Sequence, residues 1–226
     1  MKRTLVQEVM TTPVVTATEA MPFRDLAALL YARDIGAVPV LAPAGQLVGV
    51  VSRPDLIPKT AGLAGAAGLC PGFGSRRRER RRALARTAGE LMTAPAVTVA
   101  PLATVEQAAR LMRRHRVGRL PVTFPLTGRL AGIVTRSDLL RVYRRPGEEI
   151  RAEIENEVLP WVRDADPRRL AVSVRDGVVS ISGRVEARSA VARLVSAVLT
   201  VEGVVGVDER LGFDLDDRYP PIPVIF

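Results

Sequence analysis

Two short polar segments carry side chains whose types and spacing suit ligand chemistry. Ser52-Arg53-Pro54-Asp55 and Thr135-Arg136-Ser137-Asp138 each place a hydroxyl three residues before a carboxylate. This spacing is that of a capping box, which stabilises the start of a helix by about 1 kcal/mol. Each tetrad also follows a Gly-x-x at the end of a predicted strand, where glycine lets a ligand approach the backbone and a helix N-terminus suits a phosphate. The same residues therefore predict a helix cap and a candidate ribose-phosphate site.

Other side chains do not assemble into a reactive group. His115 is the only histidine and Cys70 the only cysteine, so the sequence predicts neither a His/Cys zinc site nor a Cys–His pair. The carboxylates Glu153, Glu155 and Glu157 are typical of a solvated helix face. Because no acid-base pair, nucleophile or metal-ligand set is apparent, we expect a protein without enzymatic activity.

The sequence contains an internal duplication. Three segments occur twice in the same order: residues 9–16 and 91–98, residues 35–40 and 117–122, and residues 49–56 and 132–139. The offset between the copies grows by one residue after the Pro-Val pair, which places an insertion in a turn near Thr127. A near-constant period of this kind is typical of a duplicated module.

Each copy predicts a short extended segment, a helix, a strand, a turn, a strand and a second helix that begins at Ser52 or Thr135. The apolar residues within 23–30 and 105–112 have helical spacing. The expected division is a first repeat over residues 1–58, a Gly/Ala-rich then Arg-rich linker over 59–86, a second repeat over 87–145, a third unit over 147–217 and a Pro-rich apolar tail over 218–226. The linker leaves room for a short arginine-rich helix before Leu84.

The third unit predicts the order helix, strand, strand, helix, strand. Ile150, Ile154 and Val158 have the spacing of one helical face. Asp176-Gly177 separates two segments of alternating apolar residues, which is typical of a β-hairpin. A helix over residues 187–199 and a strand over residues 204–213 complete the unit. The expected fold class of the whole chain is α/β (α+β).

The net charge of +9 is unevenly distributed. Residues 59–86 carry eight basic and one acidic side chains (+7), residues 87–146 carry ten and three (+7), and residues 147–217 carry nine and fifteen (−6). The six arginines within residues 76–82 make a nucleic-acid-binding protein one alternative. Nucleic acid is nevertheless a disfavoured partner, because the run lacks interleaved aromatic residues and a recognition motif.

A single cysteine excludes an intrachain disulfide and favours a reducing compartment. The sequence shows no apolar run long enough for a signal peptide or a membrane span. We therefore expect a cytoplasmic protein.

The repeats resemble the CBS domain, the nucleotide-sensing module named for cystathionine β-synthase, over about residues 5–58 and 87–144. The resemblance rests on the duplicated segments and implies a tandem pair with pseudo-two-fold symmetry, two clefts for adenosine-type ligands, and a homodimer formed through the CBS helices. The implied ligand is AMP, ADP, ATP or another adenosyl compound, with no covalent cofactor. The implied contacts are Asp55 and Asp138 to ribose hydroxyls, Ser52 and Thr135 to ribose or phosphate, Thr16 and Thr98 around adenine, and Val38 and Leu120 as apolar and backbone contacts to the base.

The two copies differ in charge at one implied contact. In energy-sensing kinase subunits of this family, a basic residue just before Leu-Pro-Val contacts phosphate. Arg119 occupies that place in the second copy and Ala37 in the first, and residues 113–116 add further positive charge. We therefore expect the second cleft, with Asp138, to prefer a phosphorylated ligand. The first cleft, with Asp55, is expected to be weaker, empty or suited to a less charged molecule.

The third unit resembles the BON domain over about residues 147–214, through the hairpin at 176–185 and the segment 201–207. Members of that family are often tied to membranes or phospholipid, which makes a membrane-associated stress protein a second alternative. A charge of −6 would be repelled by an anionic leaflet, so a membrane is a disfavoured partner and we expect an interaction or regulatory module. Trp161 is expected in the core of this unit or at an interface.

These observations together favour a non-enzymatic regulatory protein. The CBS-like pair would sense an adenine nucleotide or adenosyl ligand and pass the signal to a protein partner whose identity the sequence leaves open. Such signalling requires the ligand to bind one arrangement of the pair better than another.

Overall fold

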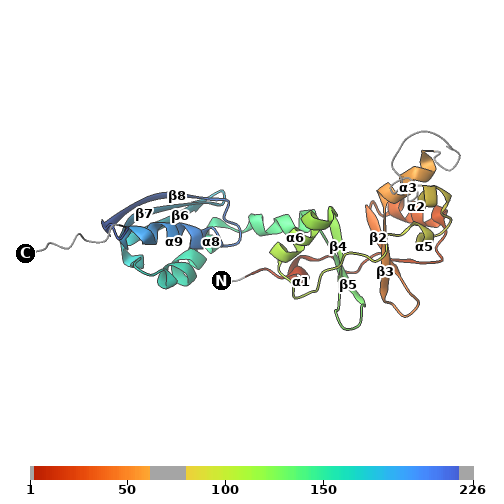
Figure 1. Ribbon diagram of the computed structural model, residues 1–226, viewed down its shortest axis with the longest axis horizontal. Helices are drawn as coiled ribbons and strands as arrows, with labels where there is room; N and C mark the ends of the chain where they lie inside the picture. Colours follow the sequence, from red (N-terminus) through yellow and green to blue (C-terminus); the bar gives the residue numbers. More distant parts are fainter. Residues whose placement is uncertain (1–2, 62–79, 219–226) are drawn as a thin grey trace, which may run out of the picture. The chain divides into compact units, whose positions relative to one another are not determined.

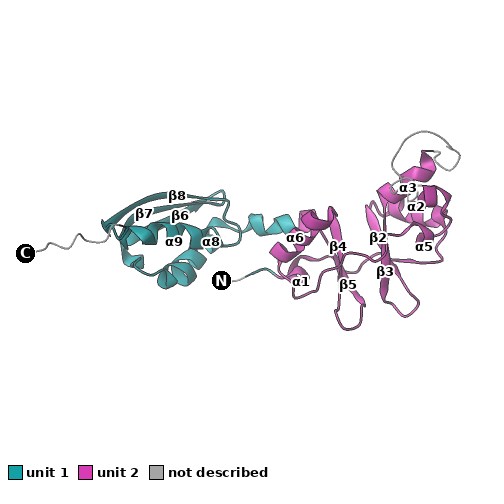
Figure 2. Ribbon diagram, viewed as in Figure 1, with its two compact units in different colours: residues 1–4, 139–226 teal, residues 5–138 magenta. Residues whose placement is uncertain are grey.

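The computed structural model of the protein describes residues 3–61 and 80–218. These residues form two compact units, shown in Figure 2: residues 5–138, which hold most of both repeats, and residues 3–4 together with 139–218. Cys70, the arginines at 76–78 and the apolar tail from residue 219 lie outside the described residues. Within the described part of the chain, no helix is both long enough and apolar enough to cross a membrane.

The first repeat has the expected order of helix, strand, strand and helix, preceded by a short helix and a short strand (Figure 1). Its elements are α1 (Val6–Val9), β1 (Ala17–Thr18), α2 (Phe23–Ala32), β2 (Ala37–Leu41), β3 (Leu47–Ser52) and α3 (Arg53–Thr60). Strand β2 pairs parallel with β1 and antiparallel with β3. Pro22 occupies the N-cap of α2, where its missing N–H leaves no helical hydrogen bond unmade.

The second repeat follows the same plan. Residues 80–84 are helical and precede α5 (Ala88–Leu91), α6 (Val105–His115), β4 (Arg119–Thr123), β5 (Leu130–Thr135), α7 (Arg136–Leu139) and the 3-10 helix η1 (Leu140–Arg144). Helix α6 begins with a capping box, in which Gln107 N donates to Thr104 Oγ1 (3.2 Å) and Thr104 N donates to Gln107 Oε1 (3.0 Å). The β4–β5 turn is one residue longer than the β2–β3 turn, which confirms the predicted insertion.

The opening segment of each repeat packs on the other repeat. In α1, Val6 N–H donates to the carbonyl oxygen of Ala103 (2.8 Å), just before α6. In the opposite direction, Ala88 and Leu91 of α5 are fully buried in the core of the first repeat, together with Leu26 of α2. Each half of this unit is therefore built from both copies of the duplicated sequence.

Backbone pairing between the repeats is reciprocal. Thr11 and Ile133 exchange two N–H···O bonds of 2.8 and 3.2 Å, and Val50 and Thr93 exchange two of 3.1 and 2.9 Å. These residues occupy equivalent positions in the two copies, so the paired contacts have the symmetry expected of a tandem pair.

The third unit has the predicted order, with additional short helical turns. Its elements are α8 (Gly147–Glu153), the π-helical turn η2 (Ile154–Val158), the 3-10 turns η3 (Leu159–Trp161) and η4 (Pro167–Arg169), β6 (Leu170–Arg175), β7 (Val178–Ala187), α9 (Arg188–Val198) and β8 (Gly206–Leu215). Strand β7 lies between antiparallel β6 and parallel β8. Positive φ angles at Asp176 (52°) and Gly177 (77°) make the tight β6–β7 hairpin that the Asp-Gly pair predicts.

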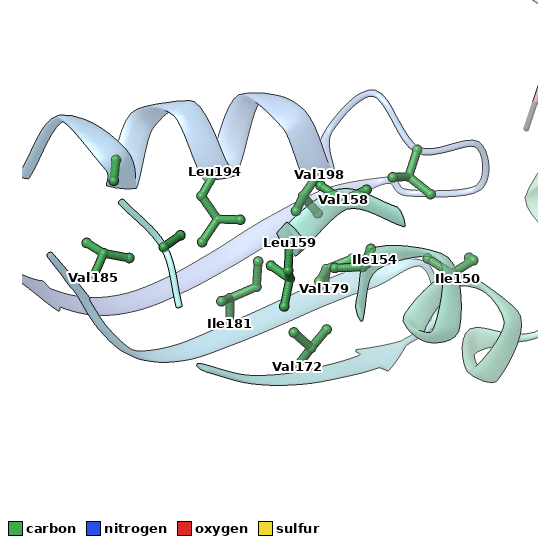
Figure 3. Packing of buried hydrophobic residues seen from close by; sticks show 13 residues of the cluster. Ile150, Ile154, Val158, Leu159, Val172, Val179, Ile181, Val185, Leu194 and Val198 are labelled. Carbon is green, nitrogen blue, oxygen red and sulfur yellow. The ribbon is translucent and has the colours of Figure 1, made fainter. Parts of the chain in front are cut away.

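The core of the third unit lies between its sheet and its helices (Figure 3). Ile154, Ile181 and Leu194, from η2, β7 and α9, are each at most 1% exposed and point into this layer. Trp161, in contrast, is 86% exposed, so the expectation that it lies in the core is wrong. Leu159, two residues earlier in η3, takes the buried position instead, and Trp161 points to solvent.

Candidate functional site

A cavity of about 330 Å³ lies within the unit that contains both repeats. The residues that line it come from four segments: Gly36 and Ala37 at the start of β2, Val50, Ser52, Pro54 and Asp55 where β3 meets α3, Thr93, Ala96 and Val97 after α5, and Arg116, Val117, Gly118, Arg119 and Pro121 just before and within β4. The cavity thus combines a hydroxyl–carboxylate pair, an apolar wall and arginine side chains. Such a combination suits a ligand with hydroxyl donors, a flat apolar part and an anionic group.

Asp55 is held in place at the start of α3. The backbone N and the Oγ of Ser52 both donate to Asp55 Oδ2, at 2.7 and 2.6 Å. Asp55 is only 5% exposed, and its other oxygen forms an ion pair with Arg82. The predicted capping role of this tetrad is confirmed, and the same carboxylate also lines the cavity.

Arg119 brings a positive charge to this cavity. Its guanidinium lies against Gly36, where an added Cβ would stand 2.8 Å from Nη1 and 2.9 Å from Cζ. Burial, and secondarily the charge of nearby Arg53, lowers the pKa of Arg119. An arginine nevertheless stays protonated in proteins, so Arg119 offers a partly desolvated cation to an anionic group.

The location of Arg119 corrects the expected pairing of site residues. The sequence places Arg119 and Asp138 in one copy, which led to the expectation that they share a cleft. In the structure Arg119 instead lines the cavity of Asp55, because its side chain reaches across to the first repeat at a position where Gly36 has no side chain. The cavity expected to be less charged therefore contains the candidate phosphate contact.

Asp138 repeats the local geometry of Asp55 without its ion pair. Thr135 N and Oγ1 donate to Asp138 Oδ2 at 2.8 and 2.7 Å, and the backbone N of Asp138 donates to Thr135 Oγ1 at 3.4 Å. Among the described residues, no basic side chain forms an ion pair with Asp138. The two candidate ribose contacts, Asp55 and Asp138, thus have the same helix-cap geometry, but only Asp55 has an ion-pair partner among the described residues.

The remaining predicted contacts do not lie in the cavity of Asp55. The side chains of Val38 and Leu120 are fully buried, and the apolar and backbone contacts of these two residues to the base stay predictions. Thr16 is not among the residues that line this cavity. Thr98 lines a separate cavity of about 400 Å³, together with Arg110 and other residues of α6.

The two glycines that precede the tetrads also have a different role from the expected one. An added Cβ at Gly49 would lie 2.5 Å from Met92 Sδ, and one at Gly132 would lie 3.0 Å from Met10 Cγ. Each glycine therefore accommodates a methionine from the exchanged segment of the other repeat. In this structure these contacts, rather than the approach of a ligand, account for the missing side chains.

Sequence reasoning missed Thr93, Ala96 and Val97 as residues that line the cavity, and Arg82 as the ion-pair partner of Asp55. The first three belong to a duplicated segment, but the duplication alone does not reveal that the segment crosses to the other repeat. Arg82 is one of many arginines in the linker, and no local pattern distinguishes it from its neighbours.

Two α/β repeats that exchange their opening segments, followed by a separate unit of three strands and covering helices, define a tandem-repeat module joined to a small α/β domain. The chain belongs to the CBS domain family: the CBS domain matches residues 6–61 and 88–145, and a BON domain matches residues 147–212. The tandem CBS pair and the BON domain inferred from the sequence are thereby confirmed.

Relatives in several organisms share the CBS pair. Hypoxic response protein 1 of Mycobacterium tuberculosis is 30% identical over 138 residues, which cover 61% of this chain and 84% of that protein. The CBS domain-containing protein YhcV of Bacillus subtilis is 28% identical over 134 residues, covering 59% and 81%. An uncharacterized protein of Methanocaldococcus jannaschii, MJ1404, is 28% identical over 182 residues, or 77% of this chain, and the chain spans 41% of its length.

Solved structures of CBS pairs have the same fold. CBSX2 of Arabidopsis thaliana, crystallised in complex with AMP, is 27% identical with a TM-score of 0.54, covering 61% of this chain and 95% of that one. The CBS domain pair of protein MJ0100, in complex with 5′-methylthioadenosine and S-adenosyl-L-methionine, is 23% identical with a TM-score of 0.50, covering 63% and 98%. The predicted mixed α/β fold of the CBS pair is confirmed.

Proposed function

We propose that this protein is a non-enzymatic sensor of an adenine nucleotide or another adenosyl compound. The observation that carries the proposal is the convergence of Ser52, Asp55 and Arg119 on one cavity of about 330 Å³ between the repeats. The crystal structure of the related CBSX2 in complex with AMP supports an adenosyl ligand.

The chemistry of each wall suggests how such a ligand would be held. Asp55 accepts hydrogen bonds from the ribose hydroxyls, because an ionised carboxylate is a pure acceptor and the two neighbouring ribose hydroxyls are donors. Arg119, which lines the same cavity, binds phosphate with a charge-assisted bond strengthened by its partial burial. Ala96 and Val97 provide an apolar surface for the base. Asp138 and Thr135 form a second ribose-type site of lower charge.

Calorimetric titration with AMP, ADP and ATP tests the proposal on three variants. Asp55→Ala is expected to weaken nucleotide binding at the first cavity at least tenfold. Arg119→Ala is expected to weaken the binding of nucleotides more than the binding of adenosine. Asp138→Ala is expected to remove only the second, weaker binding event in the titration. Equal losses from Asp55→Ala and Asp138→Ala would contradict the unequal sites, and no binding of any of these ligands to the wild type would refute the proposal.

We further propose that the CBS pair forms a homodimer through its helices and that the ligand-bound state passes a signal to a protein partner. Tyr31 on α2 (87% exposed) and Ile57 on α3 (58% exposed) are apolar side chains that such a contact would cover. Native mass spectrometry of freshly purified protein measures the bound mass and the oligomeric state together. A monomer at all concentrations would exclude the dimer and leave the ligand proposal intact.

A further inference from the structure

Arg82 connects the two walls of the Asp55 cavity. Its guanidinium forms an ion pair with Asp55 Oδ1, and its Nη2 donates to Thr93 Oγ1 at 3.0 Å. The Arg82 side chain is 18% exposed and that of Asp55 is 7% exposed, so the pair is largely withdrawn from water. Both partners of Arg82 line the cavity, one from each repeat.

The ion pair engages the carboxylate oxygen that a ribose would need. Asp55 Oδ2 already accepts two hydrogen bonds from Ser52, which hold the start of α3. Oδ1 is the oxygen left to accept hydroxyl donors, and Arg82 already occupies one of its two lone pairs, so the two donors of a ribose diol cannot both bind there without displacing it. Because an ion pair of low exposure is little screened by salt or water, a ligand hydroxyl must compete with a strong internal donor.

The second repeat shows that this arrangement is not a requirement of the helix cap. Asp138 makes the same bonds to Thr135, and among the described residues it has no arginine partner. The capping box is therefore complete without an ion pair, and the contact of Arg82 with Asp55 needs a separate explanation.

We propose that Arg82 is an internal competitor for the ribose position of the first cavity, so that ligand binding detaches the helical segment 80–84 from the cavity wall. The inference rests on the proposed function, because it assumes a ribosyl ligand at Asp55. The segment carries Arg80 and Arg81, which are exposed, in addition to Arg82. Ligand binding would thus be converted into a change in the position of a basic segment, which is a readout that a partner can detect.

The affinity of AMP for the first cavity tests the competition. The titrations use the full chain in an Asp138→Ala background, which leaves the first cavity as the site observed. Arg82→Gln is expected to bind AMP about tenfold more tightly than the parent. The reason is that the Asp55 carboxylate no longer has to be released from the ion pair before it can bind the ligand. Arg81→Gln removes the same charge from an exposed neighbour and is expected to change the affinity less than twofold. Unchanged or weaker binding by Arg82→Gln would overturn the proposal, since it would make Arg82 neutral or a ligand contact.

Cleavage by trypsin after Arg82 gives a second readout, identified by mass spectrometry of the fragments. Saturating AMP is expected to raise this cleavage rate in the wild type about tenfold, and Asp55→Asn is expected to raise it without ligand. The variant Arg82→Lys keeps a cation at residue 82 and is the folding control for Arg82→Gln. If Asp55→Asn leaves cleavage unchanged without ligand, the inference fails even where AMP binds. If AMP, ADP and ATP all fail to bind while Asp55→Asn exposes Arg82, the proposed function fails, and with it the competition with ligand.

Discussion

Arg119 lies directly over Gly36, and the two residues belong to different copies of the duplicated sequence. An added Cβ at Gly36 would stand 2.8 Å from Arg119 Nη1, closer than real side chains approach. The equivalent glycine of the second copy, Gly118, would meet only Arg136, at an ordinary 3.8 Å. The absence of a side chain at residue 36 therefore allows Arg119 to enter the cavity of Asp55.

Replacing Gly36 by alanine is expected to move Arg119 out of the cavity and to weaken AMP binding. The loss of one charge-assisted contact corresponds to about 1–2 kcal/mol, roughly a fivefold to thirtyfold rise in Kd. Calorimetry on Gly36→Ala measures the effect, and Gly206→Ala, which lies in the third unit and has open space around an added Cβ, is the control with an unchanged Kd. A similar Kd for both variants and the wild type would contradict a role of Arg119 in holding phosphate.

The glycines beside the exchanged methionines provide a prediction about stability. Gly49→Ala is expected to destabilise the CBS unit by about 1–3 kcal/mol, because its Cβ would meet Met92 Sδ at 2.5 Å and the backbone oxygen of Thr93 at 3.0 Å. Denaturant unfolding measures the change, and Gly118→Ala, whose added Cβ would meet only Arg136 at 3.8 Å, is the control, with a stability equal to or slightly above that of the wild type. Equal unfolding midpoints for Gly49→Ala and Gly118→Ala would show that the repeats do not rely on this close packing.

The elements of this fold were largely predictable because they depend on local signals. The Asp176-Gly177 pair has the two positive φ angles that its residue types allow, and the hairpin forms where the alternating pattern places it. The capping boxes at Ser52 and Thr135 begin their helices as their spacing indicates. In these cases residues close in the sequence decide the structure.

The candidate site was only partly predictable because it depends on contacts between the copies. The identity of Arg119 as a candidate contact came from its sequence position, but its assignment to Asp55 required knowledge of where its side chain crosses. Val38 illustrates the same limit, because the sequence alone does not show that β2 is buried on both of its faces. Long-range packing, which one sequence does not display, decides such questions.

The exposed position of Trp161 gives a prediction for the third unit. Trp161→Ala is expected to change the free energy of unfolding by less than about 0.5 kcal/mol, because the side chain is 86% exposed. Leu159→Ala, two residues away and 1% exposed, is expected to cost about 2–5 kcal/mol. Unfolding followed by circular dichroism compares the two variants. A large loss from Trp161→Ala would indicate that the tryptophan is covered in solution, as it would be at an interface.

Asp214 on β8 gives the third unit a predictable dependence on pH. Hydrogen bonds from Arg169 (2.7 Å) and Arg184 (2.9 Å) lower the pKa of Asp214 below its ordinary value of 3.8. Because the folded-state pKa is the lower one, the ionised carboxylate stabilises the fold above the unfolded-state pKa, and this contribution is lost as the pH falls through the folded-state pKa. The stability difference between the wild type and Asp214→Asn is therefore expected to be constant above about pH 5 and to shrink toward pH 2.

Unfolding followed by circular dichroism provides the free energies for this comparison. The control is Asp208→Asn, which removes a carboxylate of the same strand that forms no ion pair among the described residues. Added salt is expected to reduce the effect of Asp214→Asn, because its carboxylate is 43% exposed and its ion pairs are screened. A difference between wild type and Asp214→Asn that stays constant down to pH 2 would show that the two arginines do not stabilise the ionised form.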